Sequence, residues 1–225
     1  MNNDDKSVTD AKREASASDS SNSSLQEARS VSHVEASLSD FSSLNRQIST
    51  RIYQRFTQGR IISKQRYDKM SASLKDDKDY TYLFRYLNEF TLLYSLIGKQ
   101  LEHNVRGEFF YINSTTDSDV DEADEHALKT QSILMVLARH FEMSGRSIDN
   151  LGNHSLGFGA KDIAEIASND EYKAICRALR FANWQKAVDY LVNRGFAFES
   201  ANEHYFLSSA GKAFCEQVVE AYDNK

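Results

Sequence analysis

The segment LVNRGFAFESANEHYFLSSAGKAF, residues 191–214, constrains the fold more than any other part of the sequence. A helical pattern ends at Gly195, two short runs follow on either side of a polar turn at 201–203, and a helical pattern resumes at Ser209. Glycine permits a sharp exit from a helix. The segment therefore predicts a β-hairpin between two helices. The residues predicted to form its buried face are Phe196, Phe198, Tyr205 and Leu207.

Three helical patterns precede this hairpin in the second half of the chain. They cover 127–143, 160–177 and 183–194, with Asn183 as a predicted N-cap, and a glycine-rich loop over 144–159 is predicted to be mobile. A group of three helices closed by a β-hairpin is the winged-helix plan, a variant of helix-turn-helix.

The first half predicts the same order of elements. Helical patterns cover residues from Asn45 to a stop at Gly59, then about 64–74 and 80–97, and two short strands surround a turn at 105–107. The predicted fold class is therefore mainly α with small β-hairpins, an α+β protein of two tandem winged-helix domains.

Composition sets the domain boundaries. Residues 1–44 are rich in Ser, Asp, Ala and Asn with almost no aromatics, which predicts a disordered tail. The N-terminal winged-helix domain is assigned to 45–113 and the C-terminal one to 126–225. Between them the segment STTDSDVDEADE, residues 114–125, is predicted to be an acidic linker.

The net charge of −6 is unevenly distributed along the chain. Residues 1–44 carry eight acids and four bases, and residues 114–125 carry six acids and no base. Residues 45–113 hold 12 bases against 7 acids, so the first domain is basic. This distribution permits contact with nucleic acid or with acidic partners without requiring it.

Several functional classes find no support in the sequence. No apolar run is long enough to span a membrane, and Cys176 and Cys215 are too few for a disulfide framework, so we expect free buried thiols and a cytoplasmic protein. The stretch GFGAKD, residues 157–162, lacks the remaining residues of a phosphate-binding loop. The histidines are scattered. We expect no enzyme activity, no cofactor and no metal site.

Basic residues near the third helix of the second domain are the candidate DNA contacts. Lys173, Arg177 and Arg180 are spaced to share one helical face. The third helix adds Asn183, Lys186 and Arg194. These side chains either contact phosphates without reading sequence or form a solvated charged face. Asp189 in the middle of the helix disfavours base readout.

Two further groups in the first domain are candidate interaction sites. A basic cluster could bind DNA, an acidic partner segment or the acidic linker, or form a solvated surface; it comprises Arg51, Arg55, Arg60, Lys64, Arg66 and Lys69. The aromatics of the long helix either fill the core or form a partner interface. They are Tyr82, Phe84, Tyr86, Phe90 and Tyr94.

Three stretches of the first half resemble one family. They are IYQRFTQGRIISKQRYD at 52–68, LFRYLNEFTLLYSLIGKQLEH at 83–103 and GEFFYI at 107–112. They look like the N-terminal domain of MukE and MksE, accessory subunits of bacterial condensin-like SMC complexes, and the second half fits in order and length. The Ser-rich leader and the lack of a long acidic C-terminal tail favour the MksE branch or a related plasmid-defence system.

The resemblance implies a non-catalytic, nucleoid-associated subunit that forms a homodimer and binds a MukF/MksF-like kleisin. It implies a MukB/MksB-like SMC subunit, which carries the ATPase, and contact with double-stranded DNA without sequence preference. Chromosome organisation and plasmid defence are both open as its role. The alternative is a free-standing winged-helix transcription regulator.

Overall fold

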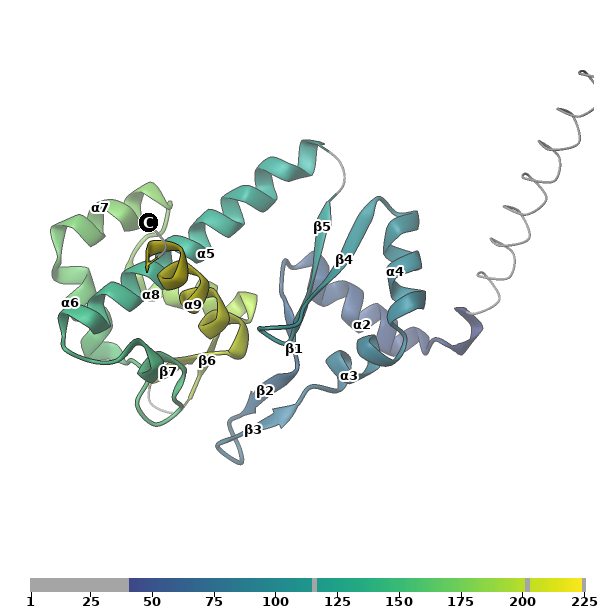
Figure 1. The fold of residues 1–225 in the computed structure, drawn as a ribbon, viewed down its shortest axis with the longest axis horizontal. Helices are drawn as coiled ribbons and strands as arrows, with labels where there is room; N and C mark the ends of the chain where they lie inside the picture. Colours follow the sequence, from purple (N-terminus) through teal and green to yellow (C-terminus); the bar gives the residue numbers. More distant parts are fainter. Residues whose placement is uncertain (1–40, 115–116, 201–202, 224–225) are drawn as a thin grey trace, which may run out of the picture. The chain divides into compact units, whose positions relative to one another are not determined.

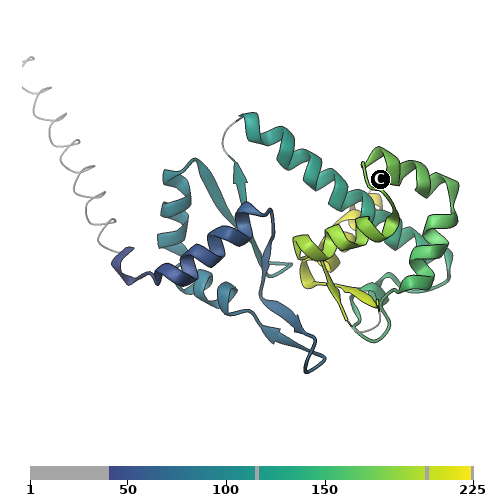
Figure 2. The same cartoon turned by 180° about the vertical axis from the view of Figure 1, so that it is seen from behind.

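The computed structural model describes residues 41–114, 117–200 and 203–223. Of the predicted disordered tail, residues 1–40 lie outside this range, and Phe41–Ser43 form a short 3-10 helix, η1. Residues 45–225 form one compact unit. Its elements before helix α5 make up the first half, and α5 with the elements after it makes up the second half (Figure 1 and Figure 2).

The first half combines three helices with five short strands. Strand β1 pairs with β5, and β5 pairs with β4, so the three form one antiparallel sheet, while β2 and β3 form a separate hairpin. The elements are α2 (Arg46–Thr57), β1 (Ile62–Ser63), β2 (Gln65–Asp68), β3 (Ser73–Asp76), α3 (Lys78–Arg85), α4 (Leu87–Leu96), β4 (Lys99–Asn104) and β5 (Phe109–Ser114).

The predicted helix at 64–74 is wrong, because this segment forms most of the β2–β3 hairpin. In the hairpin Met70 is 98% exposed and Leu74 is 44% exposed, so the apolar spacing that suggested a helix reflects no buried face. The hairpin instead pairs Tyr67 with Leu74 and adds an ion pair between Asp68 and Lys75.

The predicted helix at 80–97 is two helices that meet at Tyr86. This residue has φ −113° and ψ 37°, so it ends α3 and precedes α4. The buried residues Leu83 and Phe90 recur with the same helical phase on either side of the break. Apolar periodicity therefore could not reveal it.

The second half is mostly helical. The predicted helix at 160–177 is divided at Asn169, whose side chain accepts hydrogen bonds from two backbone amides at the start of α7. The elements are α5 (Asp117–Met143), η2 (Ile148–Gly152), α6 (Ala160–Ser168), α7 (Asp170–Ala178), α8 (Trp184–Arg194), β6 (Ala197–Glu199), β7 (Tyr205–Leu207) and α9 (Ser209–Asp223).

The segment 114–125, predicted to be an acidic linker, is mainly helical. Helix α5 begins at Asp117, so residues 117–125 form its first turns, Ser114 ends β5, and 115–116 lie outside the described residues. Acidic residues are favourable at a helix N-terminus, where the partial charge of the helix is positive. The charge run that suggested a linker is therefore compatible with a helix start.

The hairpin after Gly195 is confirmed. Gly195 has φ +91°, and β6 pairs antiparallel with β7, with Ala197 opposite Leu207. Its predicted buried face is only partly right, because Phe198 is half-buried and all three residues of β7 are buried. The other face of β7 is covered as well, since the ring of Phe206 lies 5.2 Å from that of Tyr67.

The glycine-rich loop at 144–159, predicted to be mobile, is tied to the hairpin. Phe158 and Tyr205 exchange two backbone hydrogen bonds of 2.8 and 2.7 Å. A Cβ atom at Gly157 would lie 2.0 Å from the Tyr205 carbonyl oxygen, so glycine is needed there for close approach. The glycine that suggested flexibility instead permits packing.

The second half has an extensive core around α5 and α8. Leu137, Phe141 and Leu191 are completely buried in it, together with Trp184. Cys176 and Cys215 are free and buried, as predicted, and burial raises the pKa of the Cys215 thiol to about 12.

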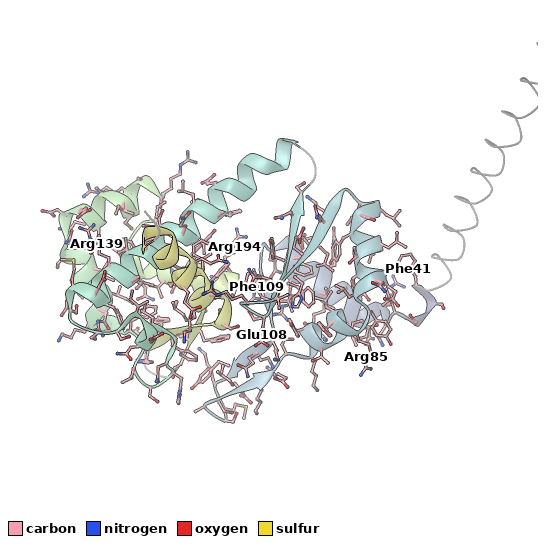
Figure 3. The ribbon with its side chains drawn as sticks, in the orientation of Figure 1. Phe41, Arg85, Glu108, Phe109, Arg139 and Arg194 are labelled. Carbon is pink, nitrogen blue, oxygen red and sulfur yellow. The ribbon has the colours of Figure 1, made fainter. Side chains whose placement is uncertain are left out.

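The two halves are joined by hydrogen bonds at the C-terminus of α8. The Ile61 amide donates to the Arg194 carbonyl oxygen at 3.0 Å, and the Arg194 guanidinium donates to the Gly59 carbonyl oxygen at 2.7 Å. The Ser209 hydroxyl donates to the Gly107 carbonyl oxygen at 2.8 Å. Figure 3 shows Arg194 and Phe109 in the region where the halves meet.

Apolar side chains reinforce this joint. Ile61 and Phe109 from the first half are buried against Ala210 from the second, and the Phe109 and Phe196 rings lie 6.3 Å apart. The halves therefore share a small core of their own. We call this contact, with the hydrogen bonds of Arg194, the inter-half joint.

Substituting Gly195 by alanine tests the joint. A Cβ atom there would lie 3.0 Å from Cγ1 of Ile61, whereas a Cβ atom at Gly145, which also has positive φ, meets nothing within 4 Å. We expect Gly145→Ala to cost about 1–2 kcal/mol from the backbone conformation alone. Gly195→Ala should cost at least about 1 kcal/mol more, because it also overpacks the joint.

Chemical denaturation of both variants measures the two costs. Equal losses of unfolding free energy in Gly145→Ala and Gly195→Ala would show that the contact with Ile61 carries no stability.

Candidate nucleic-acid and partner interfaces

The predicted DNA-contacting residues lie mainly on α7 and at the start of α8. Tyr172 and Cys176 form the buried side of α7, while Lys173 and Arg177 lie on its outer side. Arg180 follows in the turn after α7, in a left-handed conformation with φ 62°. The structure therefore places these three cations on one short stretch of surface chain.

These cations are weakly held. Lys173 pairs with Asp170 at 2.8 Å, and Arg180 lies 4.0 Å from Glu125 with its side chain 81% exposed. Arg177 is exposed and forms no ion pair with any described residue. Exposed ion pairs contribute little, so these groups can exchange their partners for phosphate oxygens.

The start of α8 supplies the two remaining members of this group. The Asn183 side chain caps α8 by accepting the Lys186 amide at 2.9 Å, so its oxygen already has a structural role. Lys186 pairs with Asp189 at 3.0 Å and is 64% exposed. We call the half-buried Lys173 together with the exposed Arg177, Arg180 and Lys186 the α7–α8 face.

The exposed side of α8 is poorly equipped to read bases. Gln185 donates to Asp189 at 3.0 Å and to the Tyr205 hydroxyl at 2.8 Å. Its amide, the group that recognises adenine in other proteins, is therefore used internally. This arrangement favours phosphate contact over sequence readout.

Arg194 is separate from the α7–α8 face. Besides its bond to Gly59, its guanidinium contacts the His126 ring at 2.8 Å and lies over the Tyr190 ring at 5.1 Å. These contacts hold it at the inter-half joint. We therefore assign Arg194 a structural role in place of the predicted DNA contact.

Two members of the predicted basic cluster are also structural. Arg51 and Arg55 both donate to the Asp79 carboxylate, and Arg55 also donates to the Asp77 carboxylate at 2.9 Å. Asp77 and Asp79 lie at the start of helix α3. Both carboxylates are buried. Burial would raise the pKa of Asp79, but the hydrogen bonds from the two arginines outweigh it and leave that pKa lowered.

The rest of the cluster divides into paired and unpaired cations. Lys64 pairs with Glu108 at 2.5 Å, and Lys69 pairs with Glu199 of the second half at 2.5 Å. Arg60 and Arg66 form no ion pair with any described residue. Only part of the predicted patch is thus available to a ligand.

The aromatic residues predicted as a partner interface also divide. Phe90 and Tyr94 are completely buried, with the Tyr94 ring 5.6 Å from that of Phe56, so both belong to the core. Tyr82 and Tyr86 are half-buried, with rings 4.7 Å apart. Phe84 is 57% exposed. Helical spacing alone could not separate these groups.

Folding also brings together a cluster of ligating groups that no pattern in the sequence predicted. Nε2 of His140 lies 3.4 Å from Asp162 and 3.6 Å from Glu165. Arg146, however, already donates to Asp162, and the Gly159 amide occupies its other oxygen at 2.9 Å. A cation would have to displace an arginine, so we assign this cluster to the α5–α6 contact.

Comparison with known families decides the identity. The family model for MksE, a condensin complex protein, matches residues 47–219. The chain belongs to the MksE family. No curated protein matches it. None of the described helices has the length and apolar character needed to cross a bilayer.

Membership makes this MksE-family chain an accessory subunit of a condensin-like complex. The match covers the joint, the α7–α8 face and the basic cluster, but it assigns no function to individual residues. Their roles follow from the contacts described above.

The Asp79 cluster predicts an acid-dependent stability. Folding lowers the pKa of Asp79 from its unfolded value near 3.8. The Asp79 carboxylate therefore stabilises the fold fully above the unfolded pKa, and this stabilisation is lost as the pH falls through the folded pKa. We expect Asp79→Asn to destabilise the fold by about 1–3 kcal/mol at pH 7. The difference from the parent protein should shrink as the pH approaches 2.

Urea unfolding between pH 2 and 7 measures this effect. Asp76→Asn, which changes an exposed carboxylate at the end of β3, is the matched control and should stay within about 0.5 kcal/mol of the parent protein. A loss for Asp79→Asn that does not change with pH would contradict the assignment.

Proposed function

We propose that the chain is a non-catalytic subunit of a MukBEF/MksBEF-type complex that binds the kleisin, forms a homodimer and contacts double-stranded DNA through the α7–α8 face. Through the kleisin it acts beside the SMC subunit, whose ATPase supplies the energy, in chromosome organisation or plasmid defence at the nucleoid. The observation that carries the DNA contact is the set of weakly paired cations on α7, in the turn after it and at the start of α8.

The proposal includes two tandem winged-helix domains. In the first half, helices α2, α3 and α4 precede the hairpin β4–β5, and β1 pairs with β5. In the second half, α5 to α8 precede the hairpin β6–β7, and Phe158 forms a bridge with Tyr205 in β7. In each half, the segment between the first two helices therefore pairs with the second strand of the hairpin. This shared arrangement supports the same winged-helix plan in both halves.

The homodimer interface is proposed for the exposed apolar residues of α3 and α4. Phe84, Leu96 and Ile97 are each more than half exposed, and Tyr82 and Tyr86 are half-buried. Exposed apolar side chains on two consecutive helices offer a surface for a protein partner. We therefore place the second copy against the first half and leave the α7–α8 face for DNA.

A regulator that reads one operator is the alternative function. Membership of a condensin family gives it no support, and the internal hydrogen bonds of Gln185 disfavour base recognition. The two functions predict different binding: one preferred sequence for a regulator, and equal binding of unrelated duplexes for the condensin subunit.

Reversal of two charges on the α7–α8 face tests the DNA contact. In the assembled complex, Arg177→Glu with Arg180→Glu should weaken binding to unrelated duplexes by about tenfold or more. The slope of log K against log salt should fall by about 0.9 for each phosphate that the complex no longer neutralises. The matched control is Arg46→Glu with Lys161→Glu, two exposed cations that lie outside both the α7–α8 face and the proposed dimer interface.

Fluorescence anisotropy over a range of salt concentrations measures both quantities. Unchanged affinity would indicate a structural adaptor without DNA contact. A strong preference for one duplex would support the regulator instead.

A further inference from the structure

Helix α7 ends with a residue type that the local backbone conformation disfavours. The Arg180 amide donates to the Arg177 carbonyl oxygen at 2.9 Å, and the Phe181 amide donates to the Cys176 carbonyl oxygen at 3.0 Å. This pair of hydrogen bonds defines a Schellman motif, in which the residue after the C-cap is left-handed and is usually glycine. At that position α7 has Arg180, with φ 62°. A long charged side chain thus stands where glycine is favoured.

Other helix ends of the same chain have the usual residue. Helices α2, α5 and α8 end with the same pair of hydrogen bonds, and each has glycine at the left-handed position. Among the described helices with this ending, only α7 lacks glycine. The other described non-glycine residues with positive φ lie in hairpin turns, and they are Ala72, Glu108 and Glu203.

The Arg180 side chain does little within the fold to offset this conformation. A left-handed backbone brings Cβ close to the following carbonyl oxygen, a contact that glycine avoids. The Arg180 side chain is 81% exposed, and its ion-pair partner Glu125 lies 4.0 Å away. Glu125 pairs more closely with Lys129, at 2.7 Å. An exposed and loosely paired guanidinium contributes little to stability.

The electrostatics of α7 do not account for Arg180 either. A cation near the C-terminus of a helix is favoured by the partial negative charge there. Arg177 already supplies a cation in the last turn of α7. The residue after the helix could therefore be glycine without loss of this interaction.

The turn that contains Arg180 is well placed for contact with a DNA backbone. It joins α7 to α8, the second-half helix that leads into the hairpin. In helix-turn-helix proteins the helix before the recognition helix crosses the DNA backbone, while the recognition helix enters the major groove. An arginine between two such helices can reach a phosphate, which its planar guanidinium holds through two hydrogen bonds.

We infer that Arg180 is a phosphate contact that the chain retains although it lowers the stability of the fold. This inference deepens the proposed DNA contact and rests on it. Stability and DNA binding should therefore change in opposite directions when Arg180 is replaced by glycine. No such opposition is expected at Arg177, whose backbone is helical.

Arg180→Gly and Arg180→Ala separate the effect of the backbone from that of the side chain. Arg180→Gly should raise the thermal unfolding midpoint by about 2–4 °C, because glycine relieves the left-handed backbone. Arg180→Ala keeps the disfavoured backbone and should leave the midpoint within about 1 °C of the parent protein.

Both variants should weaken DNA binding by the assembled complex. We expect the affinity for unrelated duplexes to fall by about threefold or more in each. The slope of log K against log salt should fall by about 0.9, the value for one phosphate. Ala72→Gly is the matched control, because Ala72 has φ 47° in an exposed turn outside the α7–α8 face, and it should leave the affinity and the slope unchanged.

Thermal unfolding and fluorescence anisotropy together decide the matter. If Arg177→Glu weakens DNA binding but both Arg180 variants bind like the parent complex, this inference alone is overturned. A midpoint for Arg180→Gly no higher than that for Arg180→Ala also overturns it, because the backbone would then carry no strain. If the parent complex does not bind DNA, the proposed DNA contact and this inference fail together.

Discussion

The hydrogen bond from the Ile61 amide to the Arg194 carbonyl oxygen is the contact on which the rest of the structure depends. It lies at the end of α8, where Gly195 turns the chain into the hairpin, and beside it the Arg194 guanidinium reaches Gly59. These bonds, with the small core around Phe109, make residues 45–225 one unit. Direct contacts of Tyr67 and Lys69 with the second hairpin add to the joint in holding β2 near β6.

The distribution of charge follows from the same packing. In the folded chain Arg194 donates a hydrogen bond at the joint, and Arg51 and Arg55 donate to the carboxylates at the start of α3. Among the described residues, Arg177 of the α7–α8 face and Arg60 and Arg66 of the first half are left without an ion pair. The first of these groups is the one that we propose for contact with DNA.

Local signals predicted much of this fold, and contacts between distant residues account for most of what they missed. Gly195 and the alternation after it predicted the hairpin, and Asn183 predicted the start of α8, because each acts on adjacent backbone. The sequence could not reveal that Asp79 pairs with an arginine 28 residues away. For the same reason Arg194 resembled a DNA contact, since its partner Gly59 lies 135 residues earlier.

Native-state hydrogen exchange at the Ile61 amide tests the central claim, that the joint makes the two halves one cooperative unit. If it does, this amide should exchange only through global unfolding, with the same exchange free energy as the Phe110 amide in the centre of the first sheet. A clearly lower exchange free energy at Ile61 would mean that the halves separate while each is still folded.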